Sequence, residues 1–159
     1  MSWVILWIAK PRPCRGAINQ ENKKSKNQLK TMNEYQEKLK KKMDEYVHLI
    51  YRITKNFPKQ ELYGVVSQMR RAALSIILNI EGYARKRPLV CLNFLENSYG
   101  SLQESRYLLD FSLTEKYMSK DDYGKGAALA EEIGAMLWTE TSNLEKSSTR
   151  IKKSRNQSK

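Results

Sequence analysis

The chain has 159 residues, of which 29 are Lys or Arg and 17 are Asp or Glu, and its formal net charge is +12 at pH 7. This length fits one domain with a sizeable core and flanking segments, and the charge indicates a polyanionic partner. One histidine, two cysteines and scattered glycines exclude a zinc site, a histidine-activated nucleophile and a phosphate-binding glycine loop, so we predict no catalysis, no metal and no cofactor.

The basic charge lies mainly at the two ends of the chain. Residues 1–42 hold 11 basic and 3 acidic residues, and residues 145–159 hold 6 and 1. Residues 43–144 are nearly balanced, with 12 and 13. Basic terminal segments are commonly solvated and disordered, and contact with nucleic acid is the sharper alternative. Both interpretations stay open at this point.

Residues 1–31 do not read as part of a folded domain. The apolar stretch SWVILWIA at 2–9 is much shorter than the roughly 20 residues of a membrane span. It lacks a basic segment ahead of it, and two prolines follow. Residues 15–31 are polar and aperiodic, as in a flexible linker. We expect 1–31 to be irregular and to precede the natural start of the domain at Met32 or Met43; the alternative is an apolar patch that docks on a partner.

Cys14 and Cys91 share no short spacing that would indicate a redox or metal motif. Two scattered cysteines fit a reduced cytoplasmic protein better than a disulfide scaffold. We therefore predict a cytoplasmic protein without a membrane-spanning segment.

The first helix is predicted over 33–57. Its apolar residues alternate steps of four and three, which is the pattern of a heptad seam. The helix should end at Phe57-Pro58, because the residue before a proline is pushed out of the α region. The seam consists of Leu39, Met43, Tyr46, Ile50, Ile53 and Phe57.

Three further helices are predicted over 60–83, 88–115 and 121–146. The third should carry serines on one side that let a neighbouring helix approach closely, and Ser119 or an aspartate after it should cap the fourth. No stretch alternates with period two, so no sheet is expected. The predicted fold is an all-α antiparallel up-down four-helix bundle over 32–146, with flexible basic tails, the last being 147–159. The serines are Ser98, Ser101 and Ser105, and the predicted core face of the second helix is Leu62, Val65, Met69, Ala72, Ile76 and Ile80.

The second helix has apolar residues on a second face as well. Leu74, Ile77 and Leu78 follow Arg70 at helical spacing, on the side that should meet solvent in a bundle. A helix that is apolar nearly all round must be buried nearly all round. Another copy of the chain is the simplest cover, so we predict a homo-oligomer with these three residues at its interface.

The segment FPKQELYGVVSQMRRAALSIILNIEGYARK (57–86) resembles the signature of the four-helix-bundle proteins encoded by intervening sequences in bacterial 23S rRNA genes. The family pattern is F-P-x-x-E-x-Y-G-L-x-x-Q-L-R-R-A-A-x-S-I-P-x-N-I-A-E-G. Residues 93–112 and 131–138 resemble the family's third and fourth helices, so the resemblance covers about 43–146. The matching positions of the signature are Phe57, Pro58, Glu61, Tyr63, Gly64, Gln68, Arg70, Arg71, Ala72, Ala73, Ser75, Ile76, Asn79, Ile80, Glu81 and Gly82.

The sequence departs from the family pattern at two places. Ile77 replaces a proline, which should straighten the second helix by restoring a backbone donor. One residue is missing between Ile80 and Glu81, which rotates the following basic cluster by about 100° if the helix continues.

The resemblance implies a ring-shaped homopentamer and a biology connected with RNA. A related fold occurs in accessory proteins of diversity-generating retroelements, which bind nucleic acid and a reverse transcriptase, although the similarity there is one of fold only. Two hypotheses follow. In the first, the oligomer binds the phosphates of RNA or DNA. In the second, it is a protein-interaction scaffold or an accessory subunit, for example of a reverse transcriptase, and its arginines form structural ion pairs. The candidate nucleic-acid-binding residues are Arg70, Arg71, Arg85, Lys86, Arg87, Lys152, Lys153 and Arg155.

Overall fold

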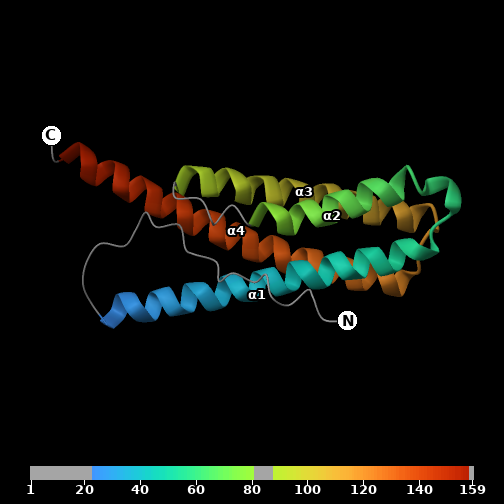
Figure 1. The fold of residues 1–159 in the computed structure, drawn as a ribbon, viewed down its shortest axis with the longest axis horizontal. Coiled ribbons are helices and arrows are strands. Elements are labelled where there is room, and N and C mark those ends of the chain that lie inside the picture. Colours follow the sequence, from blue (N-terminus) through green and yellow to red (C-terminus); the bar gives the residue numbers. More distant parts are fainter. Residues whose placement is uncertain (1–22, 81–87, 158–159) are drawn as a thin grey trace, which may run out of the picture.

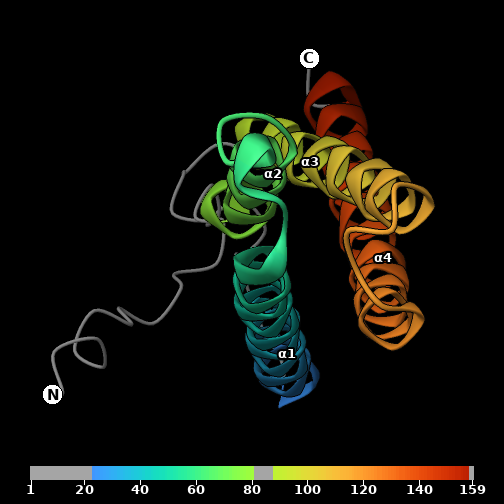
Figure 2. The ribbon, with the colours of Figure 1, turned by 90° about the vertical axis from the view of Figure 1, so that its right-hand side faces the viewer.

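The computed structural model describes residues 23–80 and 88–157, with side-chain detail for 34–80 and 89–146. Four helices make up the fold: α1 (Lys23–Ile53), α2 (Val65–Ile80), α3 (Pro88–Thr114) and α4 (Lys120–Gln157). They pack as an antiparallel bundle in which α1 and α3 both lie beside α2 and α4 (Figures 1 and 2). No strand occurs in the described ranges. The predicted all-α four-helix bundle is confirmed.

The first and last helices are longer than the sequence pattern indicated. The helix α1 begins at Lys23 rather than near 33, and α4 continues to Gln157 rather than ending near 146. Parts of both predicted tails are therefore helical. These extensions lack an apolar stripe but also lack proline and glycine, and their Lys, Arg, Gln and Leu residues favour helix. Periodicity alone misses such segments, because it detects burial and not helix propensity.

The seam of α1 forms one side of the core. All six of its predicted residues, from Leu39 to Phe57, are buried. Tyr46 lies at the centre of the bundle and its hydroxyl is hydrogen-bonded to Ser105 of α3 over 2.8 Å. Burial raises the pKa of Tyr46 to about 12, so this hydroxyl stays protonated and serves the packing of the core.

The serines of α3 let its neighbours approach closely, as predicted. Ser98 Oγ donates to the backbone carbonyl of Ile76 on α2 over 2.7 Å, and Ser101 Oγ donates to Ser75 Oγ over 2.9 Å. Small hydroxyl side chains thus line the contact between α2 and α3 and form hydrogen bonds across it. The helix α2 runs without interruption through Ile77, as expected from the loss of the family's proline.

The connection between α1 and α2 contains two single turns of 3-10 helix, Thr54–Asn56 and Lys59–Glu61. Phe57 between them is extended, with φ −71° and ψ 156°, as the following Pro58 requires. Because of these turns α2 begins at Val65 and not near 60. Leu62, which was predicted to be in the core, therefore precedes the helix and is exposed.

The connection between α3 and α4 is closed by two helix caps. Tyr117 N donates to Ser112 O and Lys116 N donates to Leu113 O, the bond pair of a Schellman motif. Lys116 takes the left-handed position with φ 60°. Ser119 then caps α4: its Oγ accepts from Asp122 N over 3.1 Å and donates to the Asp122 carboxylate. The predicted serine cap is confirmed.

The prediction of reduced cysteines is wrong for Cys91, the cysteine within the described residues. Cys91 is buried in α3 and is disulfide-bonded, whereas Cys14 lies outside the described residues. None of the helices in the described ranges has both the length and the hydropathy that a membrane span needs.

Candidate nucleic-acid interface

The up-down topology brings sequence-distant basic segments to one end of the bundle. The helices α1 and α3 begin there, and α2 and α4 end there (Figure 1). Residues 23–42 of α1 hold eight lysines and two glutamates, and residues 146–157 of α4 hold five basic residues and no acidic one. We call this end, formed by 23–42 and 146–157 together with the ends of α2 and α3, the basic end.

The two long helices diverge where the basic charge is highest. Figure 1 shows the start of α1 and the end of α4 running apart beyond α2 and α3. Two polar contacts join them before they separate: the hydroxyl of Tyr35 donates to Met136 O over 3.1 Å, and Nε2 of Gln36 donates to Glu140 Oε1 over 2.9 Å. Beyond these contacts the start of α1 forms the first arm of the basic end, and the end of α4 forms the second arm.

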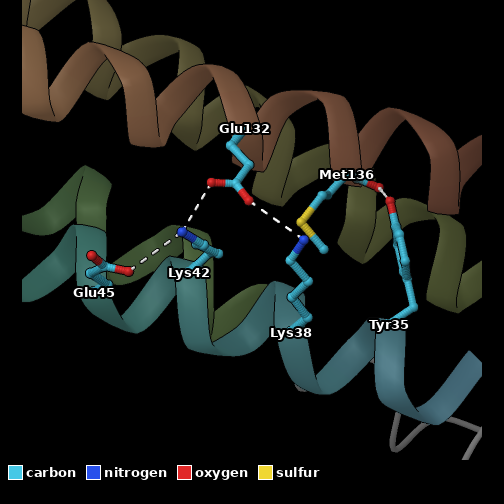
Figure 3. A network of polar contacts seen from close by, with 6 residues as sticks. All are labelled: Tyr35, Lys38, Lys42, Glu45, Glu132 and Met136. Atoms are coloured by element: carbon cyan, nitrogen blue, oxygen red, sulfur yellow. Dashed lines mark hydrogen bonds and ion pairs between the residues drawn. The ribbon is translucent and has the colours of Figure 1, made fainter.

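Glu132 of α4 pairs with two lysines of α1 (Figure 3). Lys42 Nζ lies 3.0 Å from one of its carboxylate oxygens, and Lys38 Nζ lies 3.8 Å from the other. The hydrogen bond to Glu132 raises the pKa of Lys42. These two lysines therefore serve the α1–α4 contact.

Arg70 has a structural environment. Its Nε donates to Thr54 Oγ1 over 2.8 Å, and its guanidinium lies 4.9 Å from the centre of the Tyr51 ring. Thr54 is itself buried and donates to Ile50 O. Arg70 thus ties α2 to the last turn of α1 by a cation–π contact and to the 3-10 turn that follows α1 by a hydrogen bond.

Arg71 lies on the surface beside α3. Its guanidinium is 3.7 Å from the Glu104 carboxylate, and the two side chains are 72% and 46% exposed. An exposed pair of this kind contributes about 0–1 kcal/mol and exchanges partners readily. The structure therefore separates two adjacent arginines that the sequence pattern treated alike.

The other predicted basic residues belong to the basic end or lie outside the described part. Lys152, Lys153 and Arg155 are in the last turns of α4. Arg85, Lys86 and Arg87 fall outside the described residues, in the segment that joins Ile80 of α2 to Pro88 of α3. The structure thus puts Lys152, Lys153 and Arg155 on one helix, far along the bundle from Arg70.

The predicted oligomer residues of α2 differ in exposure. Leu74 and Ile77 are half-buried and pack against the core cluster, whereas Leu78 is 65% exposed. One large aliphatic side chain is thus left uncovered on this face of a single chain.

Two features of the surface escaped the sequence patterns. Glu132 directly follows Glu131 in the sequence, and nothing in this spacing indicates that lysines of α1 face it. The aromatic side chains of Tyr107 on α3 and Trp138 on α4 are exposed, although hydrophobic residues of this size are usually covered. Among the described residues there is no group of His, Cys, Asp and Glu side chains placed to hold a metal ion.

Comparison with known proteins agrees with the four-helix fold. A model of the family described as 23S rRNA-intervening sequence protein matches residues 21–139. The chain belongs to this family. A crystal structure from Bacteroides thetaiotaomicron, of a protein of unknown function from the S23 ribosomal protein family, superposes with a TM-score of 0.63 at 19% sequence identity. The match covers 68% of this chain and 98% of that one, and at this identity it shows the shared fold. None of the curated proteins matches the chain.

The family match begins two residues before α1 and ends within α4. It includes the lysine-rich start of α1 but stops before the basic run of α4 at 146–157. The family model thus covers the first arm and most of the bundle, and the second arm lies outside the matched region.

Proposed function

We propose that this member of the 23S rRNA-intervening sequence protein family is a non-enzymatic homo-oligomer that associates with nucleic acid through phosphate contacts at its basic end. The observation that carries this proposal is that two basic helical arms lie at the same end of the bundle. The two arms are more than 100 residues apart in the sequence. Two cationic helices that start from one base and diverge offer a surface on which a polyanion can release counterions along both arms.

The contacts of the arginines support this placement of the ligand. Arg70 is held by Thr54 and Tyr51, and Arg71 is paired with Glu104. Using Arg70 for a phosphate would break its interactions with α1.

The oligomer is supported by α2. Leu78 leaves a large aliphatic side chain exposed beside the half-buried Leu74 and Ile77, and burial in a neighbour would stabilise the assembly by about 1.5–3 kcal/mol per such side chain. The family resemblance supplies the number five. An oligomer would also multiply the arms, so that several weak phosphate contacts act together on one polyanion.

The oligomer is tested by Leu78→Glu. Because Leu78 is exposed in the single chain, the variant should keep its helical circular dichroism while its mass by light scattering falls to that of the 18.6 kDa monomer. Leu78→Met is the control and should keep the assembly. A wild-type chain that is monomeric at micromolar concentration contradicts the oligomer.

Binding is tested with the full chain and a 30-base-pair RNA duplex. The variant Lys152→Ala/Lys153→Ala/Arg155→Ala should weaken binding. It should also make the negative slope of log K against log salt shallower by about 2–3, roughly one for each phosphate-binding side chain removed. A matched variant at the other end of the bundle, Lys55→Ala/Lys59→Ala/Lys120→Ala, removes three exposed charges and should change the slope far less.

Two outcomes contradict the proposal. If both triple variants weaken binding equally, net charge and not the basic end determines affinity. If the wild-type chain binds no RNA or DNA at low salt, the alternative function, a scaffold or accessory subunit for another protein such as a reverse transcriptase, takes its place.

A further inference from the structure

Trp138 is a largely exposed aromatic side chain on α4. It lies on α4 directly after the buried Leu137, and it is 67% exposed. The core face of α4 is formed by Ala130, Ile133, Met136 and Leu137, all buried. A Trp side chain dominates the energetics of the contacts that cover it, so an exposed indole on a folded helix is a strong candidate contact for a partner outside the single chain.

The same helix continues from Trp138 into the second basic arm. Of the two carboxylates between them, Glu140 is buried against Gln36, and Glu145 directly precedes the basic run. With about 100° per residue, positions 145, 149, 152 and 153 lie within about 60° of position 138 around the helix axis. Trp138 is thus on the side of α4 along which positions 152 and 153 follow.

We infer that Trp138 stacks on an unpaired base of a single-stranded nucleic acid whose phosphates follow the basic arm 146–157. The inference rests on the proposed function and narrows its ligand from any polyanion to one with accessible bases. Single-stranded nucleic acids are bound by combining a cationic track for the backbone with aromatic rings for the bases. Both parts are present here on one continuous helix.

The distances along the helix suit such a ligand. At about 1.5 Å per residue, Lys146 and Lys152 lie about 12 and 21 Å along the axis from Trp138. Successive phosphates of a stacked strand are separated by about 3.4 Å along the helix axis. The stretch from the indole to Lys152 thus corresponds to about six nucleotides of stacked strand, and to fewer when the strand is extended.

Tyr107 provides a matched control within the same chain. It is also an exposed aromatic residue, at 68% compared with 67% for Trp138. It lies on α3, in the half of that helix further from the basic end. Replacing Tyr107 removes a similar exposed apolar area without touching the helix that carries the basic arm.

The experiment uses the full chain and a 15-nucleotide RNA of mixed sequence, either alone or annealed to its complement. Affinities are measured by fluorescence anisotropy at one fixed low salt concentration. Trp138→Ala should weaken binding of the single strand about tenfold, the loss typical of one base–aromatic stack, and should change duplex binding less than twofold. Trp138→Phe should restore most of the affinity, and Tyr107→Ala should leave both affinities unchanged.

Four results would overturn the inference. Equal losses for single strand and duplex would show that Trp138 acts through shape or charge. An unchanged single-strand affinity in Trp138→Ala would remove the stacking role, while the proposed function stands if the wild type still binds. A fall in mass by light scattering in Trp138→Ala would make Trp138 a contact between subunits. If the wild type binds neither RNA, the proposed function and this inference fail together.

Discussion

The two ends of the bundle are built in different ways. The turn end, formed by residues 54–64 and 114–126, holds five basic and four acidic residues, and its side chains contact one another. The basic end carries a large excess of positive charge, and its two long helices run apart (Figure 1). At the turn end the connections α1–α2 and α3–α4 close the bundle, whereas at the basic end α1 and α4 extend beyond α2 and α3.

The turn end is held together by hydrogen bonds of Glu61 and by contacts between aromatic rings. Glu61 Oε2 accepts from Val65 N at the start of α2, and Tyr117 donates to the other carboxylate oxygen of Glu61. The Tyr117 ring packs against Phe57 and Phe111, with centroid distances of 5.7 and 6.4 Å. Polar groups used in this way are not available to a ligand. The turn end is thus held together by polar contacts as well as by aromatic packing.

The largest expected effect is that of Phe57→Ala at the turn end. Phe57 is buried and packs on Tyr117, so its truncation should lower the free energy of unfolding by about 3–4 kcal/mol. Urea denaturation measures this change. Phe57→Leu keeps most of the volume and should lower the free energy of unfolding by less than about 1.5 kcal/mol. A decrease below about 1 kcal/mol for Phe57→Ala would mean that the turn end is not a tightly packed part of the fold.

The next effect concerns the cap of α2. Glu61→Ala should lower the free energy of unfolding by about 1 kcal/mol, because Val65 N loses its side-chain acceptor. A Cβ on Gly64 would lie 2.7 Å from Glu61 Oε2, so Gly64→Ala should displace the same carboxylate. The two effects should therefore not add: in the Glu61→Ala background, Gly64→Ala should be neutral or stabilising. Additive losses in thermal unfolding would contradict this coupling.

A smaller change should strengthen the turn end. Lys116 occupies the left-handed position of the Schellman motif with φ 60°, where a side chain is strained and glycine is not. Lys116→Gly should raise the free energy of unfolding by about 0.5–1 kcal/mol. Lys120→Gly, at the first residue of α4, is the control and should not raise it, because glycine disfavours helix there. A destabilising Lys116→Gly would show that this cap is not formed in solution.

The smallest effect on stability is expected at the basic end. Lys152→Ala/Lys153→Ala/Arg155→Ala should change the free energy of unfolding by less than about 0.5 kcal/mol, while it weakens nucleic-acid binding as proposed above. Thermal unfolding of this variant beside Phe57→Ala compares the two ends directly. A large decrease of stability in the triple variant would mean that the arm is part of the fold, and the contrast between the ends would not hold.

The sequence by itself determined the core of the bundle. The heptad seam of α1, the proline after Phe57, the serines of α3 and the cap at Ser119 each predicted a local structure that the fold contains. Such features are local or periodic, and each follows from backbone sterics or from one buried face. The family signature likewise depends on the order of residues along the chain. These properties need no knowledge of which helix lies beside which.

Only the tertiary structure decided which charges serve the fold. Arg70 and Arg71 are neighbours in the chain, yet one meets Thr54 and Tyr51 while the other meets solvent and Glu104. Glu132 finds two lysines that lie on α1, far earlier in the chain, and Trp138 remains uncovered. The physical reason is that an ion pair or a buried face depends on distances between helices, and the packing of the helices sets those distances rather than the spacing of residues in the sequence.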